Sequence, residues 1–148
     1  MTEDDTRAAL LLVEDDDDDV FLFEHALARA GFRNPVQVVP DSLRAVAYLA
    51  GHDAYADRIR HPLPAVVVVD LRLPGEDGIG LLRWIRANPA LRRLAVVVFT
   101  TCNSTADLQS AWNLAVNSYL LKPSDPKSFA ATVKALAVYW LRLNLPAP

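Results

Sequence analysis

Five short apolar runs recur along the chain, and segments with the spacing of amphipathic helices lie between them. Two of the runs, AVVVV and AVVVF, contain no polar residue and are rich in β-branched side chains. Such runs are typical of strands that are buried on both faces of a parallel sheet. We therefore expect strands at Leu10–Val13, Val36–Val39, Ala65–Val69, Ala95–Phe99 and Ser118–Leu121.

The segments between these runs carry apolar residues three and four positions apart, which predicts a helix after each strand. Gly31, Gly51 and Pro89 are placed to end the first three helices, and Ser104 and Asp125 to cap the last two. The expected core stripes are Val20, Phe23, Leu27 and Ala30; Leu43, Val46, Leu49 and Ala50; Ile79, Leu82 and Ile85; Leu108, Ala111, Trp112 and Ala115; and Phe129, Val133, Leu136, Trp140 and Leu143.

Strand and helix thus alternate along the whole chain. This order predicts an α/β fold, a doubly wound five-stranded parallel sheet with right-handed crossovers and helices on both faces. A chain of 148 residues suits one domain. We expect a single domain over residues 1–148, with a core at about 8–143, short tails and no output domain.

Composition excludes several classes of function. The net charge is −3 and the arginines are scattered, so we expect no nucleic-acid partner. No apolar run approaches the ~18 residues of a membrane helix, and the acidic start MTEDDTR is unlike a secretory signal. Cys102 is the only cysteine, which excludes an intramolecular disulfide. We expect a cytoplasmic protein with no membrane partner.

Polar side chains follow the predicted strands at their carboxyl ends, where open α/β sheets bind ligands. Glu14 and Asp15 follow the first strand, Asp70 the third, Thr100 the fourth and Lys122 the fifth. Crowded carboxylates are unfavourable unless protons or a cation compensate, and Mg²⁺ prefers oxygen ligands. The sequence therefore predicts a divalent cation at this edge.

Asp70 ends a buried run and precedes LRLPGEDG, a loop rich in turn residues. A carboxylate there could attack phosphorus and form an acyl phosphate, with a cation, Lys122 and the Thr100 hydroxyl neutralising the phosphoryl oxygens. The alternative interpretation is that Lys122 is an ordinary surface lysine and that Thr100 only ends its strand. We interpret Asp16–Asp19 as solvated acids that cap the first helix.

These residues resemble the response-regulator receiver family over nearly the whole chain. The matching segments are LLVEDD at 11–16, VVDLRLPGEDG at 68–78, VVFTT at 97–101 and NSYLLKP at 117–123. The resemblance implies a (βα)5 flavodoxin-like fold and a Mg²⁺ or Mn²⁺ cofactor. It implies these roles: Asp70 as phosphoacceptor; Glu14, Asp15, Asp70 and the Arg72 backbone carbonyl as metal ligands; Lys122 as phosphoryl contact; Thr100 as switch hydroxyl and Tyr119 as the aromatic that follows it; and Pro74 and Asp77-Gly78 as motif residues.

The segments VEDDDDDVFLFEHAL, NPALRRLAVVVFTT and LAVNSYLLKP are similar to stand-alone receivers that serve phytochrome-type or related sensor histidine kinases. The long Gly51–Pro64 connection is similar too and suggests an added binding surface. Two residues depart from the family pattern. Glu14 stands where many receivers have Asp, and Ala115 stands where glycine is frequent. We expect the alanine at 115 only to tighten local packing.

The resemblance implies a signalling cycle. A histidine kinase would phosphorylate Asp70, and the face formed by the fourth helix, fifth strand and fifth helix would change. The chain would be no enzyme beyond catalysing its own phosphorylation and dephosphorylation. A second apolar face on the last helix predicts a homodimer through that helix and the C-terminal tail; it comprises Ala131, Ala135, Val138, Leu141 and Leu145.

Three other interpretations stay open. A phosphatase with an aspartate nucleophile generally has a second aspartate two residues later, where this chain has Arg72. A nucleotide-binding module would need a glycine-rich phosphate loop, and neither G-x-x-x-x-G-K-[ST] nor G-x-G-x-x-G occurs. A degenerate receiver that only binds proteins would keep the fold without turning over phosphate.

Overall fold

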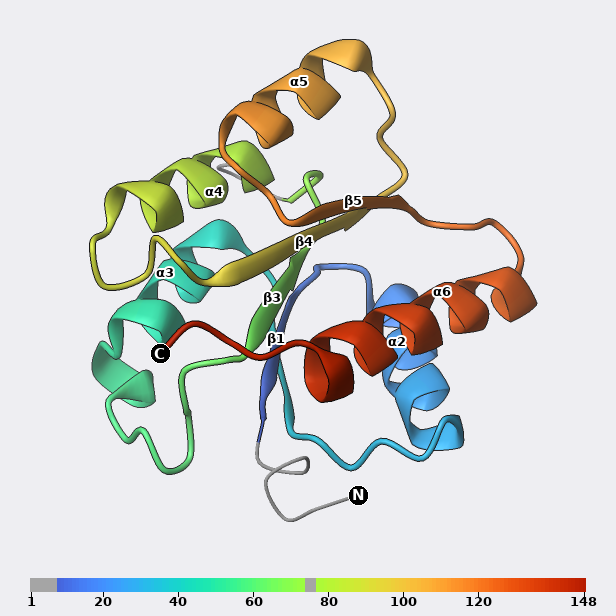
Figure 1. Ribbon diagram of the computed structural model, residues 1–148, viewed down its shortest axis with the longest axis horizontal. Coiled ribbons are helices and arrows are strands. Elements are labelled where there is room, and N and C mark those ends of the chain that lie inside the picture. The colour runs from blue at the N-terminus through green and yellow to red at the C-terminus, as the bar shows by residue number, and fades with distance from the viewer. Residues whose placement is uncertain (1–7, 74–76) are drawn as a thin grey trace.

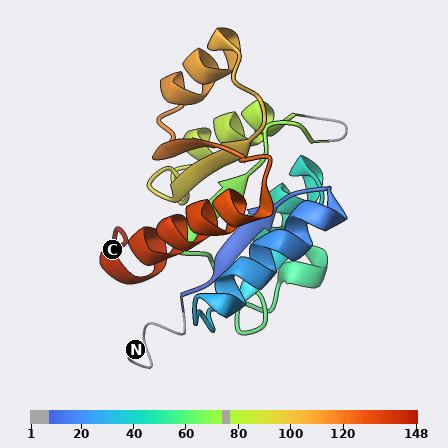
Figure 2. The same cartoon turned by 90° about the vertical axis from the view of Figure 1, so that its right-hand side faces the viewer.

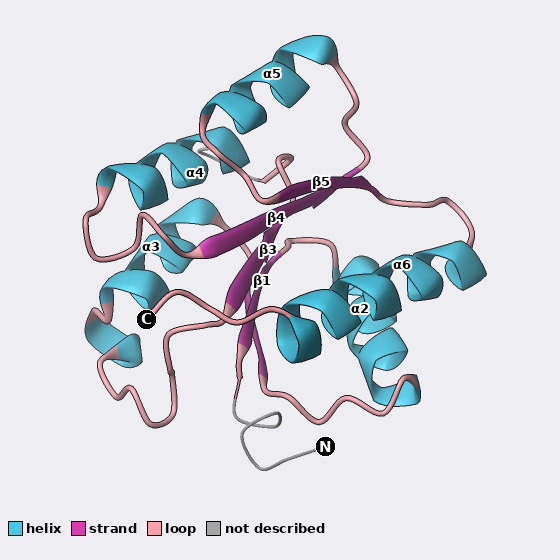
Figure 3. Ribbon diagram, in the orientation of Figure 1, coloured by secondary structure: helices cyan, strands magenta, loops and turns pink. Residues whose placement is uncertain are grey.

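A computed structural model describes residues 8–73 and 77–148 of the chain. Its centre is a parallel sheet of five strands in the order β2-β1-β3-β4-β5 (Figures 1 and 3). The strands are β1 Leu10–Val13, β2 Val36–Val39, β3 Val66–Val69, β4 Ala95–Thr100 and β5 Ser118–Leu121. The fold class is therefore as predicted, and each strand lies within one residue of its predicted bounds.

Helices cover both faces of this sheet. Helices α2 and α6 pack together on one face, and α3, α4 and α5 lie on the other (Figures 1 and 2). Their bounds are α2 Asp17–Arg29, α3 Ser42–Ala50, α4 Gly78–Ala87, α5 Thr105–Asn113 and α6 Pro126–Val138; a 3-10 turn, η1, spans Asp53–Tyr55, and a π-helical segment, η2, spans Tyr139–Leu143. Among residues 8–73 and 77–148, every helix is too short or too polar to span a bilayer.

Each of the α-helices α2 to α6 begins at a polar side chain that accepts a hydrogen bond from a backbone N–H of the first turn. The N-caps are Asp16, Asp41, Asp77, Ser104 and Asp125. The caps expected at Ser104 and Asp125 are confirmed. These short polar residues directly after a strand or loop set where each helix starts, and so which of its side chains face the sheet.

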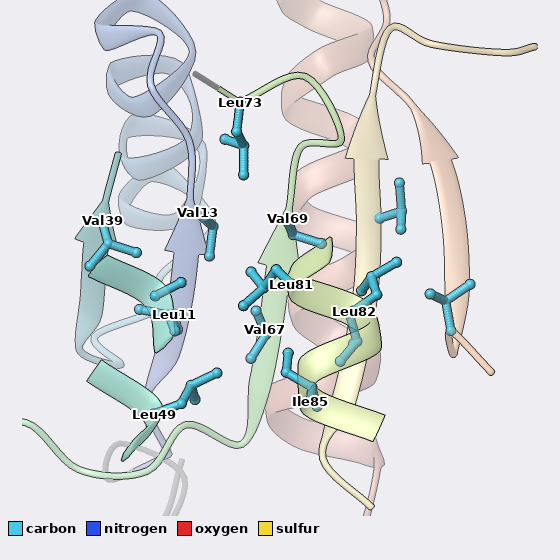
Figure 4. Close-up of a cluster of buried hydrophobic side chains, with 14 of the residues drawn as sticks. Leu11, Val13, Val39, Leu49, Val67, Val69, Leu73, Leu81, Leu82 and Ile85 are labelled. Carbon is cyan, nitrogen blue, oxygen red and sulfur yellow. The ribbon is translucent and has the colours of Figure 1, made fainter. Parts of the chain in front are cut away.

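The core consists of two layers, one on each face of the sheet. On one face, Leu11, Val13, Val67 and Val69 pack against α3 and α4, as Figure 4 shows. On the other face, the alternate strand residues Leu10, Leu12, Val66 and Val68 pack against α2 and α6. Because both faces are covered, a strand such as Val66–Val69 has no polar position, and all of its side chains are buried.

Two predicted helical stripes each contain one leucine that lies outside the core, Leu43 and Leu143, whereas stripe residues such as Leu49 and Leu136 are buried as expected. Leu43 is 80% exposed, whereas Ala45 and Tyr48 of α3 are buried. The α3 helix starts directly after Asp41, and this start turns Ala45, Tyr48 and Leu49 toward the sheet. Tyr48 tolerates burial because its hydroxyl donates a 2.8 Å hydrogen bond to the Pro62 carbonyl.

At the C-terminal end, Leu143 is 67% exposed and Leu141 is buried, the reverse of the expected stripe and second face. The physical reason is the wider turn of η2, in which the Asn144 N–H donates to the Tyr139 carbonyl five residues earlier. Trp112, expected in the core, is 52% exposed on α5.

Ala115 has a φ of +56°, in the left-handed region that favours glycine. The expectation that this alanine only tightens packing is therefore wrong, since the position requires an unusual backbone conformation. The Ala115 N–H donates to the Trp112 carbonyl as the chain leaves α5. A left-handed residue at this point ends the helix and turns the chain toward β5.

The Gly51–Pro64 connection is tied to the body of the protein by Arg58. The Arg58 guanidinium donates to the carbonyls of Tyr48 at 2.7 Å and Leu49 at 2.8 Å, the last turn of α3. It also donates to the His61 carbonyl at 3.1 Å. The long connection is therefore held by side-chain hydrogen bonds, and its Arg58 caps the C-terminal end of α3.

Candidate functional site

The strand ends bring the predicted residues together. Asp70 directly follows β3, Glu14 follows β1, and Thr100 is the last residue of β4. The register pairs Val13 with Val69 across β1 and β3, so the chain positions that follow lie at one edge. Glu14, Asp70 and Thr100 are all buried.

Lys122 joins these residues from the end of β5. Its ammonium pairs with Glu14 Oε1, with Asp70 Oδ2 at 2.7 Å and with Asp19 Oδ2 at 2.6 Å. The Lys122 side chain is only 6% exposed, so these carboxylates replace its water shell. The interpretation as a surface lysine is wrong.

Asp70 is held through both carboxylate oxygens. Oδ2 accepts from Lys122, while Oδ1 accepts from the Thr100 hydroxyl at 2.6 Å and from the Arg72 backbone N–H at 3.0 Å. The Thr100 side chain therefore contacts Asp70 directly and does more than end its strand. These three donors fix the orientation of the Asp70 carboxylate.

Burial and charge oppose each other in this cluster. Burial raises the pKa of Glu14 to about 7, although the hydrogen bond and charge of Lys122 act to lower it. Burial also disfavours the Lys122 ammonium, but the hydrogen bonds to Asp19, Asp70 and Glu14 outweigh it and hold the Lys122 pKa above its ordinary value. Three carboxylates thus share one ammonium, an excess of negative charge that a cation would relieve.

The residues of the edge fit a hard divalent cation by the chemistry of their donors. Glu14 and Asp70 offer carboxylate oxygens close to a single ammonium, and carboxylates are what Mg²⁺ and Mn²⁺ prefer. Asp15 is exposed next to Glu14. Across residues 8–73 and 77–148, no three His, Cys, Asp or Glu side chains already form a metal-binding group.

Gly78 explains the Asp-Gly pair of the motif. A Cβ at residue 78 would lie 2.7 Å from the Asp70 carbonyl oxygen and 2.8 Å from the Leu71 Cα. The Gly78 N–H donates to the Leu71 carbonyl at 3.1 Å, and Asp77 caps α4. The α4 helix therefore starts in direct contact with the backbone that carries Asp70. Pro74 lies outside the described residues.

Tyr119 contacts the loop that follows β4. Its hydroxyl donates a 2.7 Å hydrogen bond to the Cys102 carbonyl, and the Cys102 N–H donates to Thr100 Oγ1 at 3.3 Å. Residue 102 therefore connects the predicted switch hydroxyl to the predicted switch aromatic through its backbone.

The Cys102 side chain adds a second set of contacts that the sequence did not indicate. Its thiol donates to Asp107 on α5, and the Arg72 guanidinium donates to its sulfur at 3.4 Å. Hydrogen bonds from Cys102 and Ser104 hold the pKa of Asp107 below its usual value. The loops after β3 and β4 are thus linked by side chains.

Asp19 is the residue of the site that sequence reasoning missed. The sequence predicts Asp16–Asp19 as solvated acids that cap the first helix, and of these Asp16 does cap α2. The available signal is its position: Asp19 is the third residue of α2 and lies six residues after the end of β1. Spacing alone did not show that its side chain reaches Lys122.

Comparisons with known proteins agree with this geometry. Residues 10–134 match the model of the response regulator receiver domain. The probable methanogenesis regulatory protein FilR2 of Methanothrix harundinacea is 38% identical over 123 residues, 83% of this chain and 77% of its own. Response regulator Rcp1 of Synechocystis is 33% identical over 127 residues, 85% of this chain and 84% of its own.

Solved structures of response regulators are also similar to this chain, in fold and in sequence. The phosphorylated cyanobacterial phytochrome response regulator RcpA superposes with a TM-score of 0.89 at 31% identity, covering 96% of this chain and 99% of its own. The Mn²⁺-bound form of Rcp1 gives 0.87 at 31% identity, covering 95% and 99%. With the family match over most of its length, this chain belongs to the response regulator receiver family.

Proposed function

We propose that this protein is a phosphoacceptor response regulator that takes a phosphoryl group from a sensor histidine kinase onto Asp70. One observation carries the proposal. Asp70 is 8% exposed at the carboxyl edge of the sheet, and its carboxylate accepts hydrogen bonds from Lys122, Thr100 and the Arg72 N–H. Beyond its own phosphorylation and dephosphorylation, the chain catalyses nothing in this proposal.

In the transfer step, an Asp70 carboxylate oxygen attacks phosphorus and forms a P–O bond. The P–N bond of the kinase phosphohistidine breaks, and its electron pair returns to the imidazole nitrogen. Lys122 and the Thr100 hydroxyl, both within 2.7 Å of Asp70 oxygens, then stand close enough to donate to the phosphoryl oxygens. In the hydrolysis step, water attacks phosphorus, the P–O bond to Asp70 breaks, inorganic phosphate leaves, and Asp70 returns to its carboxylate form.

A divalent cation, Mg²⁺ or Mn²⁺, would be held by Glu14, Asp15, Asp70 and the Arg72 backbone carbonyl. When bound, it supplies positive charge that neutralises the carboxylates and the phosphoryl oxygens. The buried Glu14–Asp70 pair supports this assignment, as does a Mn²⁺-bound structure of Rcp1.

The signal would travel from Thr100 to Tyr119. Thr100 turns from Asp70 Oδ1 toward the phosphoryl group, Tyr119 moves into the vacated space, and the α5–β5–α6 face changes. The backbone contacts of Cys102 with both residues support this route. An unchanged Tyr119 rotamer in a complex with a phosphate mimic would contradict it.

The partner would be a sensor histidine kinase. The phytochrome class of these kinases is the candidate, because the similar protein RcpA is a phytochrome response regulator. The site of action would be the cytoplasm, with residues 1–148 working as one receiver domain. The Gly51–Pro64 connection remains a predicted binding surface, and Ile59 near its middle is 93% exposed.

A homodimer through α6 and the C-terminal tail is also part of the proposal. An apolar groove between β5 and α6 is lined by Leu120, Ala131, Ala135 and Tyr139 among others. Leu145 in the tail is 91% exposed. Leu141 is buried in the protein's own core and no longer counts toward this surface. A monomer by sedimentation at micromolar concentration, with and without phosphorylation, would contradict the dimer.

The function is tested by incubating the wild type and Asp70→Asn with acetyl phosphate, with and without Mg²⁺, and recording intact masses. We expect one phosphoryl group on the wild type, only with Mg²⁺, and none on Asp70→Asn. No gain in either protein would favour the degenerate binding module. Phosphorylation of the Asn variant would place the acceptor elsewhere.

A further inference from the structure

The acidic run at the start of α2 divides into side chains with different partners. The Asp16 carboxylate accepts from the N–H groups of Asp18 and Asp19, at 2.9 and 3.2 Å, and so caps the helix. Asp17 and Asp18 are exposed. The Asp19 side chain instead contacts Lys122 at 2.6 Å and is only 27% exposed. Helix capping accounts for Asp16 and leaves the placement of Asp19 unexplained.

The Lys122 ammonium has three N–H donors, and each has a carboxylate acceptor. Two of these acceptors, Glu14 and Asp70, are the residues that the proposed function assigns to the cation and the phosphoryl group. Once their oxygens are engaged there, the ammonium loses these partners. Asp19 comes from α2, outside the strand ends, and is assigned to neither group.

We propose that Asp19 is a positioning residue for phosphoryl transfer. It holds one N–H of the Lys122 ammonium in place while the other two turn from Glu14 and Asp70 to the phosphoryl oxygens. The inference rests on the proposed role of Asp70 and adds a residue to that site. Without Asp19, a long and flexible lysine would have to find the phosphoryl group with no fixed partner, at a cost in rotamer freedom.

Asp18→Asn provides a matched control, because it removes the same charge from an exposed neighbour in the same helical turn. Asp19→Ala and Asp19→Asn are compared with it for the rate of phosphorylation by acetyl phosphate at saturating Mg²⁺. We expect Asp19→Ala to react about tenfold more slowly than Asp18→Asn. Asp19→Asn should lose less, because its amide oxygen still accepts a hydrogen bond.

A second readout follows Lys122 without any phosphorylation. The chain contains three lysines, and Lys127 and Lys134 are exposed on α6. Acylation of the metal-free protein with an amine-reactive ester, followed by peptide mass analysis, gives the reactivity of Lys122 relative to Lys134. We expect this ratio to rise severalfold in Asp19→Ala and to stay at the wild-type value in Asp18→Asn.

Slow phosphorylation of Asp19→Ala together with a raised Lys122 reactivity supports the inference. Equal phosphorylation rates in Asp19→Ala and Asp18→Asn would overturn it while leaving the proposed function intact. So would slow phosphorylation with unchanged Lys122 reactivity, since Asp19 would then act by another route. A wild type that gains no phosphoryl group overturns the proposed function itself, and the inference with it. Circular dichroism of each variant verifies that it folds.

Discussion

The Tyr119 hydroxyl donates a 2.7 Å hydrogen bond to the backbone carbonyl of Cys102. The bond joins β5 to the loop after β4, two residues beyond the Thr100 hydroxyl that contacts Asp70. It therefore holds the aromatic ring by its polar tip. Any inward movement of Tyr119 has to break this bond first.

Tyr119→Phe removes the hydroxyl and leaves the ring. We expect the free energy of unfolding to fall by about 1 kcal/mol, because one partly buried hydrogen bond is lost. Urea denaturation measures this change. Tyr139→Phe is the control, since Tyr139 is 51% exposed, and it should change stability by less than about 0.5 kcal/mol. Equal effects of the two substitutions would mean that the bond to Cys102 contributes nothing.

Glu14 makes stability depend on pH in the metal-free protein. Its pKa is raised from 4.5 to about 7 in the fold, so between these values the folded state binds more protons than the unfolded state. The free energy of unfolding should therefore decrease as pH rises from about 4.5 to 7, by about 3 kcal/mol from this residue. Denaturation of the wild type and Glu14→Gln in the presence of a chelator measures the difference.

Glu14→Gln should lack this part of the pH dependence, because its amide does not titrate. Added Mg²⁺ should restore stability to the wild type at pH 7, since a cation favours the ionised carboxylate. If the free energy of unfolding depended on pH in the same way in both proteins, the pKa of Glu14 would not be raised in the fold, and the prediction would be wrong.

Ala115→Gly should stabilise the protein. Glycine adopts the observed φ of +56° without the steric cost that alanine bears, and we expect a gain of about 0.5–1 kcal/mol in the free energy of unfolding. Ala131→Gly, at an exposed position inside α6, should have the opposite sign and cost about 1 kcal/mol. Thermal melts of both variants compare them directly, and a loss of stability in Ala115→Gly would contradict the left-handed assignment.

Leu141 and Leu143 test the phase of the π-helical segment. Leu141→Ala should cost about 2–5 kcal/mol, the usual range for a buried leucine, because Leu141 is 5% exposed. Leu143→Ala, at a position that is 67% exposed, should cost less than about 0.5 kcal/mol. A continuous α-helix would give the reverse order. Chemical denaturation of the two variants, at a protein concentration that excludes association, distinguishes these geometries.

Much of the fold was predictable because buried parallel strands have an unmistakable composition. Val66–Val69 could only be a central strand, and the residue after it, Asp70, had to lie at the carboxyl edge. The same reasoning brought Glu14, Thr100 and Lys122 to that edge. Parallel strands in one sheet end together, so residues distant in sequence were placed in one site without any knowledge of side-chain positions.

What could not be predicted depends on rotation about helix axes and on contacts between loops. The contact of Asp19 with Lys122 depends on the orientation of α2. The burial of Leu141 depends on the π-helical turn, which the spacing of apolar residues does not predict. The contact of Cys102 with Asp107 joins a loop residue to a residue in the first turn of α5. Their separation in sequence does not predict this contact, because the loop between them has no regular backbone geometry. These features arise from packing, and the local sequence does not specify them.

The close approach of Gly78 to the Asp70 carbonyl makes these two positions inseparable in protein engineering. Any side chain at 78 would displace either the start of α4 or the backbone of Asp70 and Leu71, so the end of β3 and the helix α4 tolerate exchange only as one unit. A chimaera that joins β3 of one receiver to α4 of another should therefore place its junction after α4, never between residues 70 and 78.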